Sequence, residues 1–468
     1  MSSLTFKDKR ILVMGLGVHG GGVGVAKFFA KHGARVTVTD LKTPDELGES
    51  LKQLNGLPIE YVLGAHRELD FVNCDIVIRN PAVPRDNPFL QLARARGIPV
   101  EMEISLFCQL CPAPIIGITG TKGKTTTTLL TGTMLKEKDA RTVIAGNLRV
   151  SALELLDQID ATTPVVLELS SWQCEGLEAH QFSPRMAAIT NLHPDHLNRY
   201  KDMAEYAAAK ALIFQNQKPN DVLVLNADQK ISREFAGQAR SRVVWFSRTQ
   251  RVDGVYLRGD DITLGGDAVL DGAWVTLPPQ RIAQRSDVHL LGEHNLENVL
   301  AATALALAAG VTPSQIQNAL CNFMGVPHRL ELVRELNGVR YINDTTSTAP
   351  AAAIAALKAV GHDIILIAGG ADKALDFEAL GRSASLRAKN ILLLDGDAYF
   401  RLDDMIRYGG GGNKIVGRFT TLSDAINKAH ELAQPGDTVL LSPGCASFGM
   451  FQNEFERGEQ FRKMVMAL

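Results

Sequence analysis

The fold of this chain is decided by one stretch, Ile115-Ile116-Gly117-Ile118-Thr119-Gly120-Thr121-Lys122-Gly123-Lys124-Thr125-Thr126-Thr127-Thr128. It begins as an apolar run of β type, passes through a glycine-rich turn and ends in Lys124-Thr125 at the start of a helical pattern. Glycines let backbone N–H groups approach an anion, a helix N-terminus adds partial positive charge, and a lysine there reaches the terminal phosphates. A hydroxyl beside the lysine is able to ligate Mg²⁺. The stretch therefore predicts an ATP-binding loop.

The spacing of this loop is shorter than the common phosphate-loop pattern. That pattern requires a glycine five residues before Gly123, where Ile118 stands, so the pattern present is Gly120-x-x-Gly123-Lys124-Thr125. The alternative is an ordinary glycine turn between a strand and a helix. We expect the loop to bind ATP through Gly120, Thr121, Lys122, Gly123, Lys124, Thr125 and Thr126.

The composition is that of a globular protein of several domains. The 468 residues are 46% hydrophobic and 21% charged, which predicts two to four domains and argues against disorder. A formal net charge of −2 gives no electrostatic footprint for nucleic acid or an anionic membrane. Cys108-x-x-Cys111 has no second pair at zinc spacing, and no apolar run is long enough to span a bilayer. We predict a cytoplasmic protein with small-molecule partners, no nucleic acid and no membrane insertion.

The first domain, residues 1–103, contains a second glycine turn. Gly15-Leu16-Gly17-Val18-His19-Gly20 lies between a predicted strand (10–14) and a helix (23–31), and a further strand (35–39) ends at Asp40. This GxGxxG with a later acidic residue favours an NAD-dependent oxidoreductase. The same geometry holds any diphosphate against a helix N-terminus, and Asp40 suits a ribose or a base edge equally well. We therefore expect a Rossmann-like domain that binds a nucleotide diphosphate.

The central domain, residues 104–325, alternates strands and helices. Glu168 and His196 follow predicted strands, and Lys210 lies in an Ala-rich helix. With Thr125 from the loop, these groups suit a magnesium–nucleotide site at the carboxyl edge of a parallel sheet. Alternatively, Glu168 is a paired core carboxylate, His196 a turn histidine and Lys210 a solvated residue. A cation is the simplest partner for a buried carboxylate.

The rest of the central domain differs in pattern. Residues 250–290 contain glycine-rich turns between short alternating strands, which predicts a small antiparallel excursion at the edge of the sheet. A helix that reaches Ala309 follows, with Asn295 and Asn298 in its first turn. These amides either face an adenine or cap the helix.

The last domain, residues 326–468, begins after a hinge at 326–329 and contains a hairpin at Asn337-Gly338. Strands at 363–368, 390–394 and 438–441 alternate with helices, which predicts a second open α/β sheet. The glycine run 409–412 predicts a flexible surface loop. The fold class is therefore α/β, with a Rossmann-like first domain, a central P-loop ATPase-type domain and a Rossmann-like last domain.

With these motifs in place, the whole chain resembles the Mur ligase family of ATP-dependent amide-bond-forming enzymes in peptidoglycan precursor synthesis. It is most similar to the branch that adds glutamate to UDP-N-acetylmuramoyl-L-alanine, as Gly15–Gly17 and Asn80–Pro84 indicate. The other motifs that carry the resemblance are Thr119–Thr126, Glu168–Gln173, Thr190-Asn191, Asp195–Tyr200, Pro327–Arg329, Asn343–Thr345 and Ser442–Phe448 ahead of Glu456–Gly458.

The resemblance implies a reaction and its cofactors. ATP phosphorylates the carboxylate of the UDP-muramoyl-alanine substrate, and the amine of glutamate, expected to be the D isomer, attacks the acyl phosphate through a tetrahedral intermediate. Positioning and charge neutralisation supply most of the catalysis. The family also implies two Mg²⁺ ions, a carbamate on Lys210 that turns a cation into an oxygen ligand, and a monomer.

The resemblance assigns roles by position in this sequence. The implied catalytic residues are Lys124, Glu168, His196, Lys210 and Asn147, and the metal ligands are Thr125, Glu168, His196 and Lys210. The UDP substrate is expected at Gly17, Val18, Asp40, Lys42, Asn80, Asn147 and Ser170. Asn295, Arg329 and Asp344 are expected to contact ATP, and Thr348, Lys373, Ser447 and Phe448 the amino acid.

Three positions depart from the family pattern. Lys122 stands where relatives often carry Asn, Thr346 lies in a loop where many carry Lys, and Glu454 stands where an aromatic residue is found. The last two concern the amino-acid pocket and leave L-glutamate or another amino acid as alternatives. A folylpolyglutamate synthase-like ligase and a nucleotide-binding module without turnover are further alternatives, along with the NAD enzyme. The first domain argues against the folate enzyme because it gives a UDP group a binding site.

Overall fold

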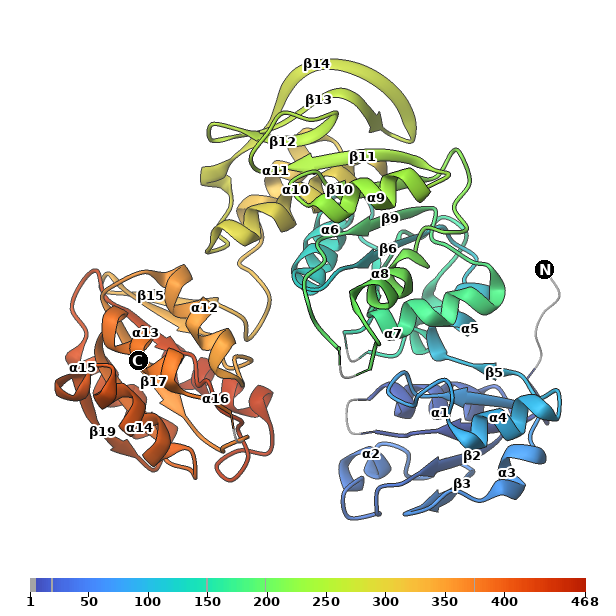
Figure 1. Ribbon diagram of the computed structural model, residues 1–468, viewed down its shortest axis with the longest axis horizontal. Coiled ribbons are helices and arrows are strands. Elements are labelled where there is room, and N and C mark those ends of the chain that lie inside the picture. The colour runs from blue at the N-terminus through green and yellow to red at the C-terminus, as the bar shows by residue number, and fades with distance from the viewer. Residues whose placement is uncertain (1–5, 18–19, 149, 198, 374) are drawn as a thin grey trace. The chain divides into compact units, whose positions relative to one another are not determined.

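The computed structural model describes residues 6–17, 20–148, 150–197, 199–373 and 375–468. Their contacts divide the chain into two compact units (Figure 1). The first contains Met1–Asp287 with Glu297–Leu320, and the second Val288–Leu296 with Cys321–Leu468. The described strands form three sheets, two in the first unit and one in the second. The predicted domain limits at 103/104 and 325/326 stay predictions.

The first sheet is parallel and has the order β3-β2-β1-β4-β5. Because the chain leaves β1 in one direction for β2 and later returns to pair β4 on its other side, a crevice is expected at the carboxyl ends of these strands. The predicted strands at 10–14 and 35–39 are confirmed. The elements are β1 (Arg10–Met14), α1 (Gly21–Lys31), β2 (Arg35–Asp40), α2 (Gly48–Lys52), β3 (Ile59–Leu63), α3 (Glu68–Val72), β4 (Ile76–Arg79), α4 (Pro88–Ala95) and β5 (Val100–Glu101).

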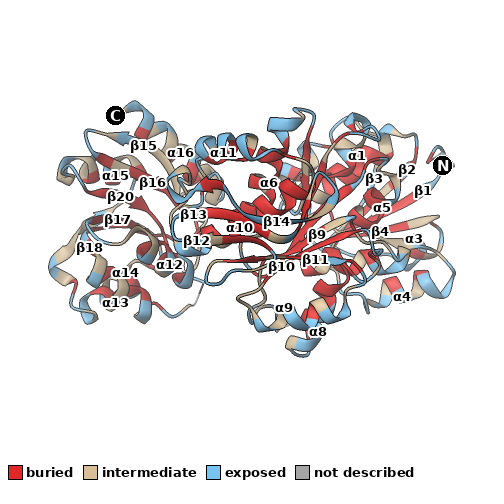
Figure 2. Cartoon of the chain, turned by 90° about the horizontal axis from the view of Figure 1, so that it is seen from above, coloured by how far each residue is buried: buried red, intermediate tan, exposed pale blue. Residues whose placement is uncertain are grey.

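The second sheet has the order β14-β13-β12-β11-β10-β9-β6-β8-β7, and β6 lies in its parallel part. All five residues of β6 are buried, as an inner strand covered on both faces requires. Its elements are β6 (Ile115–Thr119), α6 (Lys124–Lys138), β7 (Val143–Gly146), β8 (Val165–Glu168), α7 (Ser171–Cys174), β9 (Met186–Ile189), α8 (Met203–Ala211), β10 (Val222–Asn226), α9 (Lys230–Gln238) and β11 (Arg242–Ser247). In Figure 2 strands β9 and β10 are largely buried, whereas α9 shows an exposed outer face.

The antiparallel excursion is confirmed, but its strands are longer than predicted. β12 (Gly254–Arg258), β13 (Asp261–Leu270) and β14 (Ala273–Gln284) pair antiparallel at the edge of the second sheet. The last two contain 10 and 12 residues. Register shifts within the β13–β14 pair interrupt the regular alternation, which is why the sequence shows only short strands.

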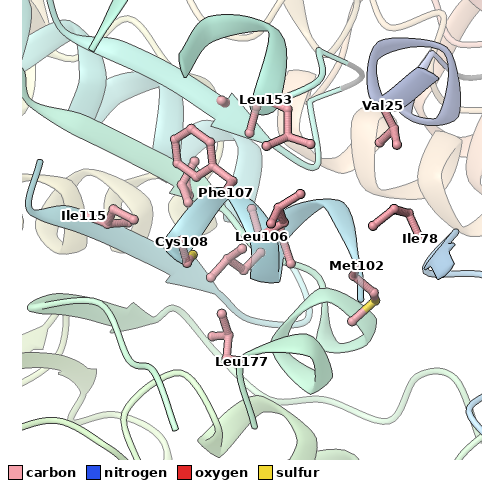
Figure 3. Close-up of a cluster of buried hydrophobic side chains, with 14 of the residues drawn as sticks. Val25, Ile78, Met102, Leu106, Phe107, Cys108, Ile115, Leu153 and Leu177 are labelled. Atoms are coloured by element: carbon pink, nitrogen blue, oxygen red, sulfur yellow. The ribbon is translucent and has the colours of Figure 1, made fainter. Parts of the chain in front are cut away.

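One hydrophobic core joins the two sheets of the first unit. Helix α5 (Glu103–Leu110) contributes Leu106, Phe107 and Cys108, which lie in the same buried cluster as Val25 and Ile78 of the first sheet's layer (Figure 3). The second sheet's layer contributes Ile115, Leu153 and Leu177 to this cluster. Each fully buried side chain of this size stabilises the fold by roughly 1.5–3 kcal/mol. The first sheet is therefore packed onto the second and belongs to one unit with it.

The apolar helix predicted to reach Ala309 is confirmed as α10 (Glu293–Ala308), and α11 (Pro313–Asn322) follows. Among the residues that the structure describes, no helix is both long and apolar enough to span a bilayer.

The third sheet, in the second unit, has the order β15-β16-β20-β17-β18-β19. Asn337 and Gly338 have φ of +52° and +77°, so the predicted hairpin between β15 and β16 is confirmed. All six residues of β17 are buried between two helical layers. The elements are β15 (Glu331–Leu336), β16 (Val339–Asn343), α12 (Pro350–Val360), β17 (Ile364–Gly369), α13 (Glu378–Arg387), β18 (Ala388–Leu394), α14 (Tyr399–Tyr408), β19 (Ile415–Phe419), α15 (Leu422–Leu432), β20 (Thr438–Leu441) and α16 (Glu454–Ala467).

The glycine run at 409–412 is not the flexible surface loop that the sequence predicts. It closes the end of α14, because the backbone N–H of Gly411 donates to the carbonyl of Ile406. Gly411 is buried, and a Cβ there would overlap Ser385 Oγ of the neighbouring helix. Gly409 and Gly411 thus serve close packing between α13 and α14, whereas Gly410 is exposed.

Candidate active site

The predicted strand–turn–helix of the phosphate loop is present. β6 ends at Thr119, and Gly123 with φ +81° is the residue before the first turn of α6. A Cβ at Gly123 would overlap Asn298 Oδ1, and one at Gly120 would overlap Thr190 Oγ1. Glycine is therefore required at both positions, as close approach of a backbone to an anion demands.

The loop is anchored from the neighbouring strand β9. Asn191 Oδ1 accepts from the N–H of Lys122 at 2.9 Å, and its Nδ2 donates to the Lys122 carbonyl at 3.0 Å. Thr190 Oγ1 donates to the same carbonyl at 2.7 Å. The side chain of Lys122 is exposed and lies 3.4 Å from Asp195. The backbone of the loop is thus held in shape by Thr190 and Asn191.

Lys124 lies over its own loop. Its Nζ donates to the carbonyls of Gly120 at 3.1 Å and Thr121 at 3.0 Å. Thr125 follows it and is half-buried, and Thr126 is buried. When ATP is bound, the Lys124 ammonium is placed to donate hydrogen bonds to phosphate oxygens instead of these carbonyl oxygens.

Glu168, at the end of β8, is 1% exposed. Its Oε1 accepts from Asn147 Nδ2 at 2.8 Å, and the Asn147 backbone N–H donates to the Glu168 carbonyl at 2.9 Å. Its Oε2 is buried and has no hydrogen-bond partner among the described residues. A buried carboxylate oxygen left in this state is costly, so the arrangement fits a cation better than a paired core carboxylate.

Lys210 is 1% exposed, so it is not the solvated residue that an Ala-rich helix suggests by default. Its Nζ donates to the Gly120 carbonyl at 2.8 Å, and burial together with nearby Lys124 lowers the pKa of Lys210 to about 7. Tyr206, one turn earlier on α8, places its ring centroid 4.8 Å from that Nζ. The sequence interpretation missed Tyr206, although its i,i+4 spacing puts it on the same helix face as Lys210.

His196 has the left-handed backbone of a turn, with φ +54°. The residue is exposed, and the centroid of its ring lies 5.3 Å from that of Trp172 and 6.1 Å from that of Tyr206. Burial lowers the pKa of His196 and favours neutral imidazole, the form that binds metals. His196 therefore lies in a turn and carries an imidazole in the form that is able to bind a metal.

The donor set formed by these residues fits Mg²⁺ that is shared with phosphates. The described parts of the chain contain no cluster of three or more His, Cys, Asp and Glu side chains able to hold a metal alone. Mg²⁺ is typically held by one or two carboxylates together with substrate phosphates. The unpartnered oxygen of Glu168, beside a phosphate loop with the hydroxyl of Thr125, meets that requirement.

A cleft of about 830 Å³ joins this loop to the first sheet. It is lined by the carboxyl ends of β1, β2 and β4 on one side and by residues around the phosphate loop on the other. The predicted site residues that line it are Gly17, Asp40, Lys42, Asn80, Lys124, Asn147, Ser170 and His196. Val18, also predicted, lies outside the described residues.

Asp40 braces the glycine turn from within. Its Oδ2 accepts from the N–H of Gly17 at 3.1 Å, and its Oδ1 accepts from the N–H of Lys42 at 2.9 Å. Gly15 has φ +89°, and a Cβ there would lie 2.8 Å from Asn80 Cβ. The turn, Asp40 and Asn80 thus form one fixed edge of the cleft.

The wall of the cleft nearest Glu168 is the start of α7. Ser170 Oγ accepts from the N–H of Gln173 at 3.2 Å, and Gln173 Oε1 accepts from the N–H of Ser170 at 3.0 Å. This capping box fixes Ser170 at the cleft. Further lining residues to which the sequence interpretation gave no role include His66, Glu103, Trp172 and Gln173.

An arginine network holds the two sides of the cleft together. Arg199 Nη1 donates to the carbonyl of Pro81 at 3.1 Å, in the loop after β4. Glu175 lies 3.4 Å from Arg199 and 3.7 Å from Arg79, and accepts from the hydroxyl of Tyr200 at 2.9 Å. These contacts therefore hold the loop that carries His196 against the loop after β4, next to the edge of the cleft formed by Asp40 and Asn80.

The remaining predicted ATP-site residues lie in the second unit. Asp344, 3% exposed, accepts from Ser442 Oγ at 2.7 Å, from Ser347 Oγ at 2.5 Å and from the N–H of Leu330 at 3.1 Å. Burial raises the pKa of Asp344 to about 6. The side chain of Arg329 is exposed, and Asn295 donates to the carbonyl of Leu291 at 2.7 Å.

The predicted amino-acid residues follow strands of the third sheet. Lys373 Nζ donates to Thr348 Oγ1 at 3.3 Å, and Phe448 is 63% exposed. Ser447 is 2% exposed, and its Oγ has no hydrogen-bond partner within the described chain. Fully buried Arg457 supports this loop, because its Nη1 donates to the carbonyl of Ala446 at 3.5 Å, and its Nε donates to Thr345 Oγ1 at 2.9 Å. The sequence interpretation quoted Arg457 in a motif without giving it a function.

Three family models match successive parts of the chain. The Mur ligase MurD-like N-terminal domain matches residues 9–101, the Mur ligase middle domain 118–306 and the Mur ligase glutamate ligase domain 328–445. The UDP-N-acetylmuramoylalanine–D-glutamate ligase of Roseiflexus sp. (strain RS-1) is 52% identical over 98% of both chains. The chain belongs to the Mur ligase family. The enzyme of the same name from Alkaliphilus oremlandii (strain OhILAs) is 39% identical to this Mur ligase over 99% of this chain and 100% of that one.

Solved structures share the fold. UDP-N-acetylmuramate-alanine ligase MurC from Thermotoga maritima is 21% identical, with a TM-score of 0.61 over 98% of this chain and 99% of that one. A MurF ligase from Thermotoga maritima, solved in complex with ADP, is 15% identical, with a TM-score of 0.54 over 98% and 96%. The predicted α/β class with three domains is therefore confirmed as the three-domain Mur ligase fold.

Membership of the family also decides among the sequence alternatives. Mur ligases are ATP-dependent enzymes that form amide bonds, so the protein is a ligase, and neither an NAD-dependent oxidoreductase nor a binding module without turnover. The GxGxxG turn and Asp40, the features that favoured NAD, belong to a domain that matches the MurD-like N-terminal model.

Proposed function

We propose that this Mur ligase adds D-glutamate to UDP-N-acetylmuramoyl-L-alanine, with ATP converted to ADP and phosphate. The observation that carries the proposal is the cleft of about 830 Å³, because it places the nucleotide turn at Gly17 and the phosphate-loop Lys124 on one continuous surface. Relatives named for this reaction match over nearly the whole chain. A UDP-sugar peptide bound at the first sheet extends its free carboxylate toward the loop.

The first half of the reaction is phosphoryl transfer to that carboxylate. The loop N–H groups and Lys124 hold the phosphates of ATP. Asn147, Ser170 and His196 line the cleft beside Lys124 and orient the substrate carboxylate. One carboxylate oxygen attacks the γ-phosphorus, the bond to the β–γ bridging oxygen breaks, and ADP leaves. The product is an acyl phosphate, formed mainly by positioning and charge neutralisation.

The second half of the reaction forms the amide. The glutamate amine attacks the acyl carbon, the tetrahedral intermediate collapses, and phosphate leaves as the nitrogen loses its proton. The amino acid is held by Thr348, Lys373, Ser447 and Phe448. The free hydroxyl of buried Ser447 and the exposed ammonium of Lys373 suit the carboxylates of glutamate. In the second unit, we assign Asn295, Arg329 and Asp344 to contacts with ATP.

Mg²⁺ fits the side chains around the loop. Thr125 and Glu168 would hold one ion, and His196 and Lys210 a second. When bound, Mg²⁺ neutralises the negative charge that builds up between ATP and the attacking carboxylate. A lysine ammonium only donates hydrogen bonds, so Lys210 enters this set as a carbamate, whose oxygens are ligands. Its burial beside the loop supports this assignment.

The remaining properties are proposed from the substrates and from the family. ATP and a nucleotide-sugar peptide are cytoplasmic compounds, so we place the enzyme in the cytoplasm, where it acts on small molecules. The resemblance to the family implies a monomer. It needs neither nucleic acid nor a membrane anchor for this reaction.

The test is phosphate release with ATP, Mg²⁺ and UDP-N-acetylmuramoyl-L-alanine, with D-glutamate and L-glutamate supplied separately. We expect release that requires D-glutamate. Release with L-glutamate alone would assign the L isomer instead. No release with either isomer, while ATP still binds, would contradict the proposed substrate.

A further inference from the structure

His66 lies in the nucleotide cleft, away from the phosphate loop, and no role has been given to it above. It follows β3 in the chain and lines the cleft together with Asp40 and Asn80. The ring is half-buried. Asp40 and Asn80 belong to the edge proposed to bind the UDP part of the substrate, so His66 lies on the nucleotide side of the cleft.

The inner side of the imidazole is fixed by one threonine. His66 Nδ1 lies 2.7 Å from Thr39 Oγ1, and Thr39 is completely buried at the end of β2. The same hydroxyl donates to the carbonyl of Ala65 at 3.3 Å. A hydroxyl has one proton, so both bonds form only if Nδ1–H donates to Thr39. This assigns the tautomer and leaves Nε2 of His66 as a hydrogen-bond acceptor.

The ring is also held by aromatic packing. Its centroid lies 5.9 Å from the ring of Phe71 and 5.2 Å from that of Phe89, with interplanar angles of 79° and 74°. Both contacts are edge-to-face, and Phe71 is fully buried. Rotation of the ring would break these contacts and the Thr39 bond together. The acceptor is therefore preorganised.

The imidazole is neutral and its outer nitrogen is available. Burial lowers the pKa of His66 against the opposing effect of Asp40. None of the described residues forms a hydrogen bond with Nε2, while Nδ1 points inward to buried Thr39. Since the ring lines the cleft and Nδ1 is engaged by Thr39, Nε2 is the ring nitrogen that remains available to a ligand there.

We propose that His66 recognises the uridine of the nucleotide substrate by accepting a hydrogen bond at Nε2. This inference rests on the proposed function, because it takes the cleft to hold UDP. The donors that uridine offers are the N3–H of the base and the ribose hydroxyls. The phosphate oxygens of UDP are almost entirely deprotonated at neutral pH, so they offer hydrogen-bond acceptors and hardly any donors. An acceptor at Nε2 therefore suits the nucleoside and not the diphosphate.

The test is calorimetric titration of the full-length protein with UDP. His66→Phe keeps an aromatic ring against Phe71 and Phe89 but removes both nitrogens, and we expect UDP affinity to fall about tenfold. His66→Gln is a second variant, expected to lose less because its amide oxygen is also an acceptor. The matched control is His32→Phe, since His32 also engages its Nδ1, at 2.8 Å from the Phe28 carbonyl, but does not line the cleft.

Two analogues locate the donor. N3-methyl-UDP lacks the base donor, and 2′-deoxy-UDP lacks one ribose hydroxyl. One of them should bind wild type about tenfold more weakly than UDP, and this difference should disappear in His66→Phe. Equal UDP affinity of wild type and His66→Phe, or analogue penalties that persist unchanged in the variant, would overturn the role of His66. A wild-type protein that binds ATP but not UDP would overturn the nucleotide assignment of the whole cleft, and this inference with it.

Discussion

The two glycine turns of the first unit have the same backbone plan and different surroundings. Each follows an inner parallel strand and precedes a helix, β1 and α1 in one case and β6 and α6 in the other. Each contains glycines with positive φ that lie against a neighbouring asparagine, Asn80 for Gly15 and Asn298 for Gly123. Both turns are therefore built to receive an anion at a helix N-terminus.

The charged groups around the turns differ. The β6 turn is surrounded by Lys124, Lys210 and the unpartnered carboxylate oxygen of Glu168. At the β1 turn, Asp40 accepts two backbone N–H bonds, so its carboxylate is used to brace the turn. Under the proposed function, the backbone supplies binding at both turns, whereas reactivity depends on the side chains placed beside the β6 turn.

The largest effect on activity should follow from removing the ammonium group of Lys124 at the β6 turn. Lys124→Met is expected to lower kcat roughly 1000-fold because the transferred phosphoryl group loses its charge partner. The matched control is Lys136→Met, at the other end of the same helix and exposed, which should change kcat little. Both are measured by phosphate release at saturating substrates. Comparable kcat values for the two variants would show that the β6 turn only binds.

The next effect concerns Glu168. Glu168→Gln keeps the hydrogen bond from Asn147 but removes the charge, so kcat should fall about 100-fold and the Mg²⁺ concentration for half-maximal activity should rise. Mg²⁺ titrations of activity measure both changes. Glu137→Gln, an exposed position on α6, is the control. An unchanged Mg²⁺ dependence would remove Glu168 from the metal site.

The carbamate on Lys210 has a direct spectroscopic test. Wild type equilibrated with ¹³C-bicarbonate should show a carbamate carbon in the NMR spectrum, and Lys210→Ala should lack it because no other described lysine shares its burial. Small carboxylates should restore part of the activity of Lys210→Ala by supplying oxygen ligands. If wild type and Lys210→Ala give the same spectrum, Lys210 carries no carbamate. It is then only a hydrogen-bond donor to the Gly120 carbonyl.

At the β1 turn, a smaller and different effect is expected. Asp40→Asn keeps only one acceptor for the N–H groups of Gly17 and Lys42, so the KM for the UDP substrate should rise about tenfold. The kcat and the KM for ATP should stay within about twofold, because the turn takes part in binding alone. Steady-state kinetics with each substrate varied in turn decide this, with Asp45→Asn as an exposed control. A fall in kcat would mean that the two turns do not differ in role.

The smallest effect concerns stability in the second unit. The pKa of Asp344 is raised to about 6 from the ordinary value of 3.8, so the folded state holds the proton more tightly than the unfolded state. Its contribution to stability is fully present below about pH 4, falls as pH rises to about 6, and is constant above that. The difference in Tm between wild type and Asp344→Asn, followed from pH 4 to 7, should shift against wild type over this window. A difference independent of pH would contradict the raised pKa.

Much of the fold follows from local pattern. Strand–glycine–helix sequences at Gly15 and Gly120, and the Asn337-Gly338 hairpin, fix backbone conformation within a few residues, so they are predictable. The lengths of β13 and β14 were not predictable, because register shifts interrupt the alternation of side chains along these strands. The packing of the 409–412 run depends on Ser385 in another helix, which no local pattern reveals.

The candidate site shows the same limit. Residues at strand ends, such as Glu168 and Asn80, are predictable because parallel strands bring their carboxyl ends together. The role of Tyr206 was missed, although its spacing to Lys210 in the sequence indicates it. No local pattern indicates the roles of His66 and Arg457, because each depends on a buried partner distant in sequence. The partner of His66 is Thr39, and that of Arg457 is Thr345.

The measurement that tests the account most directly is isotope transfer from the substrate carboxylate. UDP-N-acetylmuramoyl-L-alanine labelled with ¹⁸O in its free carboxylate is turned over with ATP, Mg²⁺ and D-glutamate, and the released phosphate is analysed by mass spectrometry. Attack of the carboxylate on ATP at the β6 turn predicts one ¹⁸O atom in each phosphate, since the acyl–oxygen bond breaks when the amine attacks. Unlabelled phosphate, with the amide product formed, would contradict the acyl-phosphate mechanism.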